Sequence, residues 1–225
     1  MKRIILTGAS DGLGKAFGKL FVSQGGEIIA LCRTKPDYEC QFIKCDLSDE
    51  KSMIRGCNTI REKYSQFDAL INCAGAQCIE PTNNTPYKKL EYVMKVNSIA
   101  PMFLISQLFD LIKQNEADIV NIGSTVGLKS GPINQMGYTT SKWAIRGTSE
   151  NISAELKKTP CRVIQFNAGG MYTRFIEKYN GKKIADEDPK DWIDPEDMAK
   201  VLMMTLQVPK NIEISDIVVN RKRKK

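Results

Sequence analysis

The 225-residue sequence contains no histidine. This absence excludes Ser-His-Asp hydrolysis, histidine general bases and the common zinc sites that use histidine ligands. The seven cysteines stand at irregular spacings, and because none of them forms a Cys-x-x-Cys pair, they do not restore a metal site. Any chemistry must therefore depend on tyrosine, lysine, serine, cysteine or carboxylate side chains, or on a bound cofactor.

Long apolar runs are missing as well. No stretch approaches the roughly 18 apolar residues that a membrane span requires. The chain enters a strand-like run at Ile4 without the apolar segment and small-residue cleavage site of a signal peptide. An odd number of cysteines without an export signal favours reduced thiols. We therefore expect a cytoplasmic protein that does not associate with membranes.

Positive charge is in excess, with a net charge of +7. Part of this excess belongs to a basic tail at residues 221–225, which we expect to be solvated. Basic tails can bind nucleic acid, but neither interleaved aromatic residues nor a known reader motif accompanies this one. Nucleic acid is therefore not expected as a partner.

Short apolar runs alternate with helical patterns along the whole chain. We expect strands at residues 4–6, 28–32, 41–45, 69–73, 118–122, 162–166 and 214–219. We expect helices at residues 13–23, 50–64, 90–113, 138–156 and 195–206. Apolar strands that are separated by helices form parallel sheets buried on both faces. No linker or repeat divides the chain, so residues 1–225 are predicted to form one doubly wound α/β domain, a three-layer αβα sandwich.

The turn after the first strand, residues 7–14, reads Thr-Gly-Ala-Ser-Asp-Gly-Leu-Gly. Glycines allow a tight turn and let the backbone approach a pyrophosphate without an intervening Cβ. The helix that begins near Leu13 adds free N–H groups and the positive end of its dipole. The position between a strand and a helix favours a dinucleotide site over a glycine-rich turn without a ligand.

Tyr138 and Lys142 form a second informative pattern. Residues i and i+4 share one face of a helix, so the phenol and the ammonium can point into the same space. A tyrosine normally titrates near pH 10, and a fixed cation nearby lowers that pKa and eases proton exchange at neutrality. Tyr-x-x-x-Lys alone is common on solvated helix faces, so its meaning depends on the rest of the chain.

Several motifs occur together, in order and at the ends of expected strands. They are Thr7-Gly-x-x-x-Gly-x-Gly14, Asp46-Leu47, Asn72-Cys-Ala-Gly75, Asn97, Ser124 and Tyr138-x-x-x-Lys142. With these motifs the chain resembles the single-domain short-chain dehydrogenase/reductase family over essentially its whole length. The resemblance implies a Rossmann-like fold with a seven-stranded, mostly parallel sheet in the order 3-2-1-4-5-6-7. It also implies reversible hydride transfer between a nicotinamide cofactor and a small carbonyl or alcohol substrate.

The resemblance implies a cofactor role for each matching residue. Asp46 would accept a hydrogen bond from the adenine amino group, although it could instead be the N-cap of the following helix. Leu47 would pack on the adenine ring, and Thr173 would hold the nicotinamide carboxamide. The other residues implied in cofactor binding are Gly8, Ser10, Gly12, Leu13, Gly14, Asn72, Ala74, Gly75, Tyr138 and Lys142.

The end of the second strand indicates which cofactor is preferred. An acidic residue there would pair with the ribose hydroxyls of NAD, but this chain has Arg33. Its guanidinium could bind the 2′-phosphate of NADP with help from Ser10 and Lys35, although an arginine here can also be an ordinary surface residue. Asp11 favours NAD, because NADP-dependent relatives often carry a basic residue in that slot. The lack of the acid matters most, so we expect NADP, with NAD as the alternative.

The resemblance also implies the catalytic roles. Tyr138 would protonate the developing alkoxide during reduction or deprotonate the alcohol during oxidation. Lys142 would lower the pKa of Tyr138 and bind the nicotinamide ribose. Ser124 would donate to the substrate oxygen, and Asn97 would anchor a water that links Lys142 to solvent. A buried Asn97 could also satisfy a kink in its helix, which is compatible with that role.

Two positions depart from the family pattern. Cys73 replaces an asparagine, and Ala168 replaces the usual proline after the sixth strand, which could make that loop more flexible. Residues 174–192 resemble the mobile segment that closes over the substrate. By resemblance the helices at residues 90–113 and 138–156 form a four-helix interface, so we expect a homodimer or a homotetramer.

Two other functions are compatible with these residues. A dinucleotide-binding sensor or scaffold would need no turnover, and the intact set of Asn97, Ser124, Tyr138 and Lys142 argues against it. A sugar-nucleotide epimerase or dehydratase can share Tyr-x-x-x-Lys, but such enzymes usually carry a larger C-terminal substrate domain. An oxidoreductase is therefore the predicted function.

Overall fold

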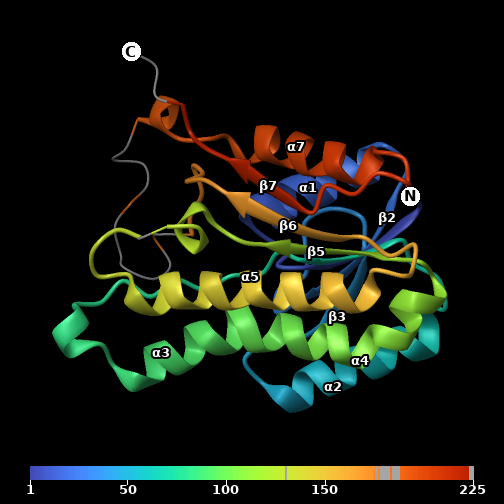
Figure 1. Ribbon diagram of the computed structural model, residues 1–225, viewed down its shortest axis with the longest axis horizontal. Helices are drawn as coiled ribbons and strands as arrows, with labels where there is room; N and C mark the ends of the chain where they lie inside the picture. The colour runs from blue at the N-terminus through green and yellow to red at the C-terminus, as the bar shows by residue number, and fades with distance from the viewer. Residues whose placement is uncertain (130, 176, 178–182, 184–187, 223–225) are drawn as a thin grey trace.

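One parallel sheet forms the centre of the protein. The structure is a computed structural model that describes residues 1–129, 131–175, 177, 183 and 188–222. Its strands lie in the order β3-β2-β1-β4-β5-β6-β7, and every neighbouring pair is parallel. The strands are β1 Arg3–Thr7, β2 Glu27–Cys32, β3 Gln41–Lys44, β4 Ala69–Asn72, β5 Asp118–Ile122, β6 Val163–Ala168 and β7 Asp216–Val219. This arrangement confirms the predicted fold class and strand order (Figure 1).

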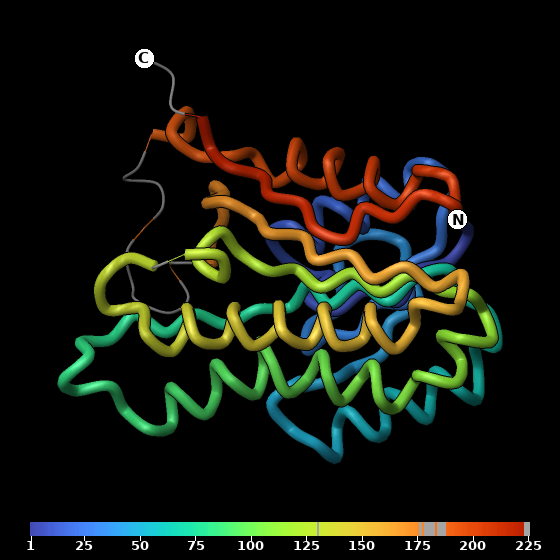
Figure 2. Tube along the Cα trace, viewed as in Figure 1, coloured from blue at the N-terminus to red at the C-terminus, as the bar shows by residue number. Residues whose placement is uncertain are grey.

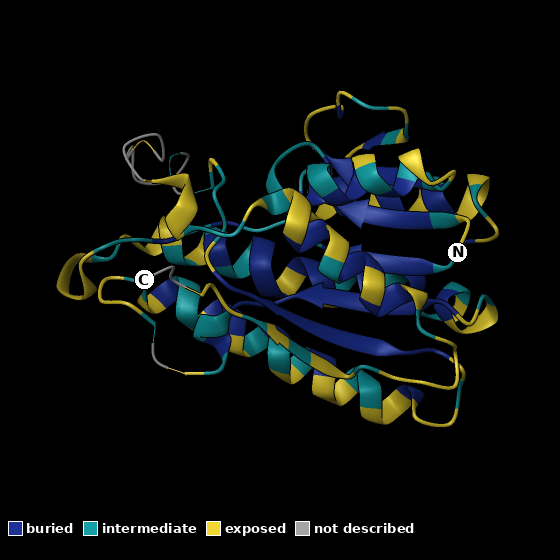
Figure 3. Cartoon of the chain, turned by 90° about the horizontal axis from the view of Figure 1, so that it is seen from above, coloured by how far each residue is buried: buried dark blue, intermediate teal, exposed yellow. Residues whose placement is uncertain are grey.

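Helices cover both faces of the sheet. α1 and α7 pack against each other on one face, whereas α2, α4 and α5 lie on the other (Figure 1). The helices are α1 Gly12–Ser23, α2 Glu50–Lys63, α3 Tyr87–Met94, α4 Ala100–Gln114, α5 Met136–Leu156 and α7 Pro195–Gln207. The central strands are therefore buried while the outer faces of the helices are exposed (Figure 3). Burial on both faces explains why the strands read as nearly uninterrupted apolar runs.

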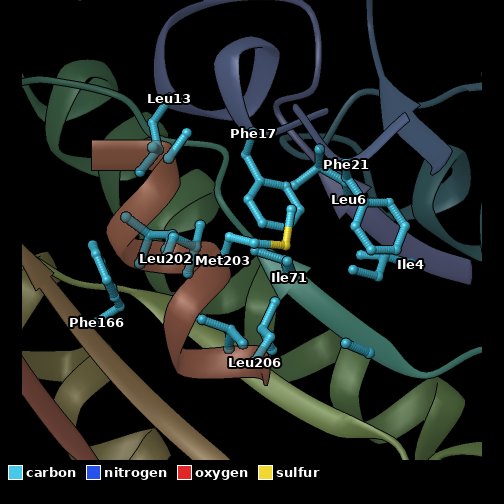
Figure 4. Packing of buried hydrophobic residues seen from close by; sticks show 14 of the residues in the cluster. Ile4, Leu6, Leu13, Phe17, Phe21, Ile71, Phe166, Leu202, Met203 and Leu206 are labelled. Carbon is cyan, nitrogen blue, oxygen red and sulfur yellow. The ribbon is translucent and has the colours of Figure 1, made fainter. Parts of the chain in front are cut away.

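Phe17 anchors α1 in the core between the sheet and α7. Its ring is fully buried and stacks on Phe21, with the two ring centroids 5.9 Å apart. Met203 and Leu202 of α7 pack beside it, and Ile71 of β4 lies below (Figure 4). Each such side chain contributes roughly 1.5–3 kcal/mol on burial. The first turn of α1, which follows β1 directly, is thus held rigidly against the sheet.

The predicted helix at residues 90–113 is wrong in two respects: it begins earlier, at Tyr87, and it is not a single α-helix. A π-helical segment, Lys95–Ile99, separates α3 from α4 within one continuous run (Figure 2). Pro101 explains the interruption, because in a regular α-helix its ring would collide with the carbonyl of Asn97, four residues earlier. A wider π turn removes that collision, and such turns are frequent at functional sites.

The remaining predicted elements agree with the structure to within two residues at each end. Within the described residues, no helix combines the length and the apolarity needed to cross a membrane.

Candidate active site

The carboxyl ends of the strands open onto a cleft of about 490 Å³. In doubly wound sheets this is the edge at which ligands bind. The predicted residues that line the cleft are Gly8, Ser10, Gly12, Leu13, Gly14, Arg33, Asp46, Leu47, Ala74, Gly75, Ser124, Tyr138, Lys142 and Thr173. The predicted residues that do not line it are Asn72, Asn97 and Lys35, which was expected to assist Arg33.

A second cavity, of about 610 Å³, lies at the opposite edge of the sheet. Its walls come from the second half of α5, the start of β6 and residues 210–216. None of the predicted site residues belongs to it. The cleft at the carboxyl ends is therefore the candidate active site.

The turn between β1 and α1 requires glycine for steric reasons. Gly8 has a φ of +68°, and a Cβ there would stand 2.8 Å from the backbone of Ala74. A Cβ on Gly14 would collide with the carbonyl oxygen of Gly8. Asp11 caps α1 by accepting a hydrogen bond from the N–H of Gly12 at 2.8 Å. The first turn of α1 thus presents backbone to the cleft, which is the arrangement that binds phosphates.

Two charged side chains stand at the far end of the cleft, at the ends of β2 and β3. Arg33 donates from Nη1 to the hydroxyl of Tyr92 on α3 at 3.2 Å. Asp46 accepts from the backbone N–H of Ser48 at 2.9 Å and from its hydroxyl at 2.7 Å. Burial raises the pKa of Asp46, but the Ser48 bonds and the Arg33 charge outweigh it and hold the pKa below the usual value. The N-cap of α2 is Asp49, so the alternative role for Asp46 does not hold.

Tyr138 and Lys142 lie on one face of α5 and share the wall of the cleft with Ser124. The Lys142 ammonium lies 5.8 Å from the centroid of the Tyr138 ring and donates to the carbonyl of Ile122 at 2.8 Å. Ser124 follows β5, and its Oγ accepts a hydrogen bond from the N–H of Val126 at 3.4 Å. The end of β5 therefore holds both the serine and the lysine, and α5 supplies the tyrosine.

The pKa values of this pair are moved mainly by burial. Burial raises the pKa of Tyr138 to about 12, and a hydrogen bond with Ser124 opposes the rise. Burial lowers the pKa of Lys142 to about 8, and the nearby Cys73 opposes the fall. The net direction for Tyr138 is thus opposite to the predicted lowering by Lys142. The Lys142 ammonium donates to the Ile122 carbonyl, while Tyr138 packs against an apolar cluster that includes Val93 and Val96, so burial dominates its pKa.

Asn97 lies behind the cleft and holds one of its walls. Its Oδ1 accepts from the N–H of Ala76 at 2.7 Å, and its Nδ2 donates to the Ala76 carbonyl at 2.8 Å and to Ser141 Oγ at 2.9 Å. Ala74 and Gly75, next to Ala76, line the cleft. Asn97 therefore ties the π-helical segment to the loop after β4 and to α5.

Asn72 points away from the cleft into a chain of buried hydrogen bonds. Its Nδ2 donates to Asn121 Oδ1 at 2.8 Å, and Asn121 Nδ2 donates to Ser149 Oγ at 2.9 Å. Ser149 Oγ donates to Gln165 Oε1 at 2.6 Å, and Gln165 Nε2 donates to Asn167 Oδ1 at 3.0 Å. We call these five buried residues the polar chain. Asn72 thus links strands rather than forming the wall of the cleft.

The loop after β6 is tied down on both sides. Gly169 donates its N–H to the carbonyl of Val219 at 2.7 Å, and Ile193 donates to Gly170 at 3.2 Å. These bonds hold the loop even though Ala168 stands where the family usually has proline. Thr173, further along the loop, lies close to Gly12, because a Cβ built on Gly12 would stand 3.6 Å from Thr173 Cγ2, and both residues line the cleft.

Part of the expected mobile segment, residues 174–192, lies outside the described residues, namely 176, 178–182 and 184–187, with Tyr179 among them. Phe175 is described, and its ring centroid lies 6.0 Å from that of Tyr138.

Tyr92 and Arg221 line the cleft and had no counterpart in the sequence prediction of the site, and Trp192, an aromatic of the expected mobile segment, lines it as well. Tyr92 bonds to Arg33, Trp192 packs beside Gly170, and Arg221 lies over the Trp192 ring. Arg221 belongs to the tail that was expected to be solvated, and the described part of that tail instead begins in the cleft wall. No local pattern marks these residues, because each reaches the cleft from a distant part of the chain.

Comparison with known proteins gives a consistent family match. The family model for short chain dehydrogenases matches residues 2–184. The chain is 26% identical over 237 residues to dehydrogenase/reductase SDR family member 11 of Homo sapiens, covering 95% of this chain and 91% of the human protein.

Two solved structures illustrate the likeness in fold. A 4-hydroxyisoleucine dehydrogenase complexed with NADH has a TM-score of 0.84 at 26% identity, covering 98% of this chain and 97% of that one. The closed form of a serine dehydrogenase complexed with NADP+ has a TM-score of 0.84 at 20% identity, covering 96% and 94%. One neighbour holds NADH and the other NADP+, so the likeness alone leaves the cofactor preference open.

Proposed function

The chain belongs to the short-chain dehydrogenase family, and on this basis we propose that it reduces a carbonyl or oxidises an alcohol as a single catalytic domain that prefers NADP(H). Family membership makes the protein an oxidoreductase that acts on CH–OH and C=O groups with a nicotinamide dinucleotide. The observation that carries the proposal is the meeting of Tyr138, Lys142 and Ser124 at one wall of the cleft.

The residues that line the cleft are suited to a dinucleotide. The turn at Gly8 and the first turn of α1 suit the pyrophosphate, because they offer backbone N–H groups at a helix N-terminus. Asp46 suits the adenine amino group, since its pKa is held low and it stays ionised. Lys142 and Thr173, which both line the cleft, would hold the nicotinamide end.

Proton transfer is assigned to Tyr138. When bound, the nicotinamide supplies or accepts the hydride. With a pKa of about 12 the phenol is protonated at neutral pH, so it is ready to donate its proton to the developing alkoxide in reduction. Ser124 shares a hydrogen bond with the phenol and donates to the substrate oxygen as charge develops there. Lys142, with a pKa of about 8, is mostly protonated at pH 7 and can bind ribose hydroxyls.

Preference for NADP rests on the end of β2. Arg33 stands there in place of an acidic residue, and its guanidinium can pair with a 2′-phosphate. Its contact with Tyr92 restrains the side chain at the adenosine end of the cleft. A restrained arginine loses less freedom on binding a phosphate than a mobile one does.

The proposed assembly is a homodimer or a homotetramer. Large apolar side chains are exposed on the π-helical segment, on α4 and on α5. They are Ile99, Met102, Met136 and Trp143. An exposed apolar surface of this kind favours association. Light scattering that gives a monomer at working concentration would contradict it.

The cytoplasm is the proposed location. All seven cysteines are unpaired, and burial raises the pKa of most of these thiols. Free thiols of this kind are typical of a reducing compartment such as the cytoplasm.

Tyr138→Phe tests the proposed reaction. Loss of the general acid should lower kcat by about 10²- to 10⁴-fold, while the Kd for NADPH changes little. Tyr87→Phe is the matched control, because Tyr87 is 76% exposed and does not line the cleft. Turnover would be followed at the nicotinamide absorbance band with a panel of carbonyls and alcohols. Full activity in Tyr138→Phe would remove the assigned role, and tight NADPH binding without turnover of any compound would favour a sensor.

A further inference from the structure

One positive charge in the cleft has no part in the proposed cofactor site. The charged residues that line the cleft, within the described part of the chain, are Asp11, Arg33, Asp46, Lys142 and Arg221. The first four lie at the phosphate turn, at the adenosine end and beside Tyr138. Arg221 follows β7 and stands beside the loop that carries Gly169, Gly170 and Thr173.

Arg221 is held in place by two contacts. Its guanidinium carbon lies 4.6 Å from the centroid of the Trp192 ring, and Nη1 donates to the backbone carbonyl of Asp191 at 3.2 Å. Gly170 makes this stack feasible, because a Cβ there would stand 2.8 Å from the Trp192 ring and 3.9 Å from Arg221 Cδ. A guanidinium stacked on an aromatic ring keeps its edge available for hydrogen bonds.

Among the described residues, the Arg221 guanidinium contacts the Trp192 ring and a backbone carbonyl, and no carboxylate. An arginine has five N–H donors, and the described contacts of this side chain use one nitrogen, with a neutral carbonyl as acceptor. Asp191 contributes its backbone oxygen and does not line the cleft. The carboxylates that line the cleft among described residues, Asp11 and Asp46, belong to the phosphate turn and the adenosine end. Within the part of the chain that the structure describes, this end of the cleft therefore carries a positive charge with no carboxylate partner, beside apolar and aromatic side chains.

We propose that Arg221 binds the carboxylate of the substrate, so that the enzyme acts on an oxo acid or a hydroxy acid. The proposal rests on the proposed oxidoreductase function and adds the class of substrate to it. A guanidinium fork binds a carboxylate through two parallel hydrogen bonds, and such charge-assisted bonds are the strong ones. The chemical step is unchanged: hydride and proton add to the carbonyl, and the carboxylate only orients the substrate.

Steady-state kinetics with matched substrates test this assignment. Oxo acids of increasing chain length would each be compared with their methyl esters, using NADPH and the full-length protein. The wild type should prefer the acid of the correct length. Arg221→Met should lower kcat/KM for that acid by about 10- to 100-fold and leave the ester nearly unchanged. Arg221→Lys should recover part of the loss, and Lys222→Met, which removes the neighbouring charge outside the cleft wall, should behave as the wild type.

Arg221 could instead bind a phosphate of the cofactor, which is also an anion. The same kinetics distinguish a cofactor phosphate from a substrate carboxylate. If Arg221→Met raises the KM for NADPH and leaves the ratio of acid to ester unchanged, Arg221 serves a cofactor phosphate and the proposal is overturned. Equal use of acid and ester by the wild type overturns it as well.

A binding assay keeps the proposal testable without turnover. The chain has two tryptophans, and Trp143→Phe leaves Trp192, against which the guanidinium stacks, as the single tryptophan, whose emission can be excited selectively at the red edge of the absorption band. Succinate added to this variant with NADP+ should change the Trp192 emission in a saturable way, and Arg221→Met should abolish the change. Binding without turnover would refute the proposed reaction and retain the carboxylate site. An unchanged emission would refute the carboxylate site itself.

Discussion

Lys142→Met should make the protein more stable at neutral pH while removing its activity. The Lys142 side chain is 5% exposed, and burial lowers its pKa from 10.5 to about 8. A buried ammonium that is protonated at pH 7 therefore opposes folding. Removing a functional group that costs stability is expected to stabilise the fold.

The size of the effect follows from the pKa. The difference between 10.5 and about 8, at about 1.36 kcal/mol per pH unit, makes the buried ammonium about 3 kcal/mol less favourable than a solvated one at pH 7. Methionine also gives up the hydrogen bond to the Ile122 carbonyl, which is worth roughly 1 kcal/mol. Lys142→Met should therefore gain about 2 kcal/mol, or roughly 4–8 °C in Tm for a chain of this size.

The pH dependence fixes the sign of the effect. Below pH 8 both the native and the unfolded Lys142 hold the proton, and the full penalty is present. Between about 8 and 10.5 the unfolded chain holds more protons, so wild-type stability rises with pH. The advantage of Lys142→Met should thus shrink across this window and end as a deficit of about 1 kcal/mol.

Urea unfolding at pH 7, 8, 9 and 10 measures this directly. Tryptophan fluorescence would follow the transition at one fixed protein concentration, because association changes apparent stability. Lys142→Arg is the matched control: its charge persists at every pH tested, so it should lack the gain at pH 7 and fall further behind with rising pH. The reasoning would be refuted if Lys142→Met were less stable than the wild type at pH 7, or if the difference did not vary with pH.

Three further substitutions have defined outcomes. Arg33→Asp should shift the ratio of kcat/KM for NADPH over NADH toward NADH, and an unchanged ratio would remove Arg33 from the phosphate site. Gly14→Ala should abolish dinucleotide binding, measured by fluorescence titration, because its Cβ would collide with backbone atoms of the same turn. Gly25→Ala is the control: its Cβ would enter open space, so its φ of +83° makes it a test of backbone strain alone. Asp118→Asn should lower stability by about 3 kcal/mol in urea unfolding, because it leaves the buried Arg162 without its carboxylate partner at 2.6 Å. A loss of less than about 1 kcal/mol would contradict that reading.

The fold could be read from the sequence because its signals are local. Apolar runs of strand length between helical patterns specify a parallel sheet, and the glycines of residues 7–14 specify the turn that opens α1. The π-helical segment was missed, although Pro101 signals it: a proline inside a helical pattern affects the residue four positions earlier.

Electrostatics of the site could not be read in the same way. The spacing of Tyr138 and Lys142 gave their common location, but the direction of each pKa depends on burial by parts of the chain that are distant in sequence. Arg221 shows the same limit. Its basic neighbours suggest a solvated tail, whereas the position of β7 beside β6 brings it against Trp192 and into the cleft wall.

The polar chain explains why Asn72 does not reach the cleft and what it does instead. Three of its links join residues 16 to 49 positions apart, so no local pattern could pair them. It passes behind Gly123, where a Cβ would stand 2.5 Å from Asn167 Oδ1. A buried amide that loses its partner costs about 1–3 kcal/mol, so each member resists displacement by the next. Gly123 directly precedes Ser124. By packing against Gly123, the polar chain therefore fixes the position of the backbone at the end of β5 and, with it, the position of the serine hydroxyl.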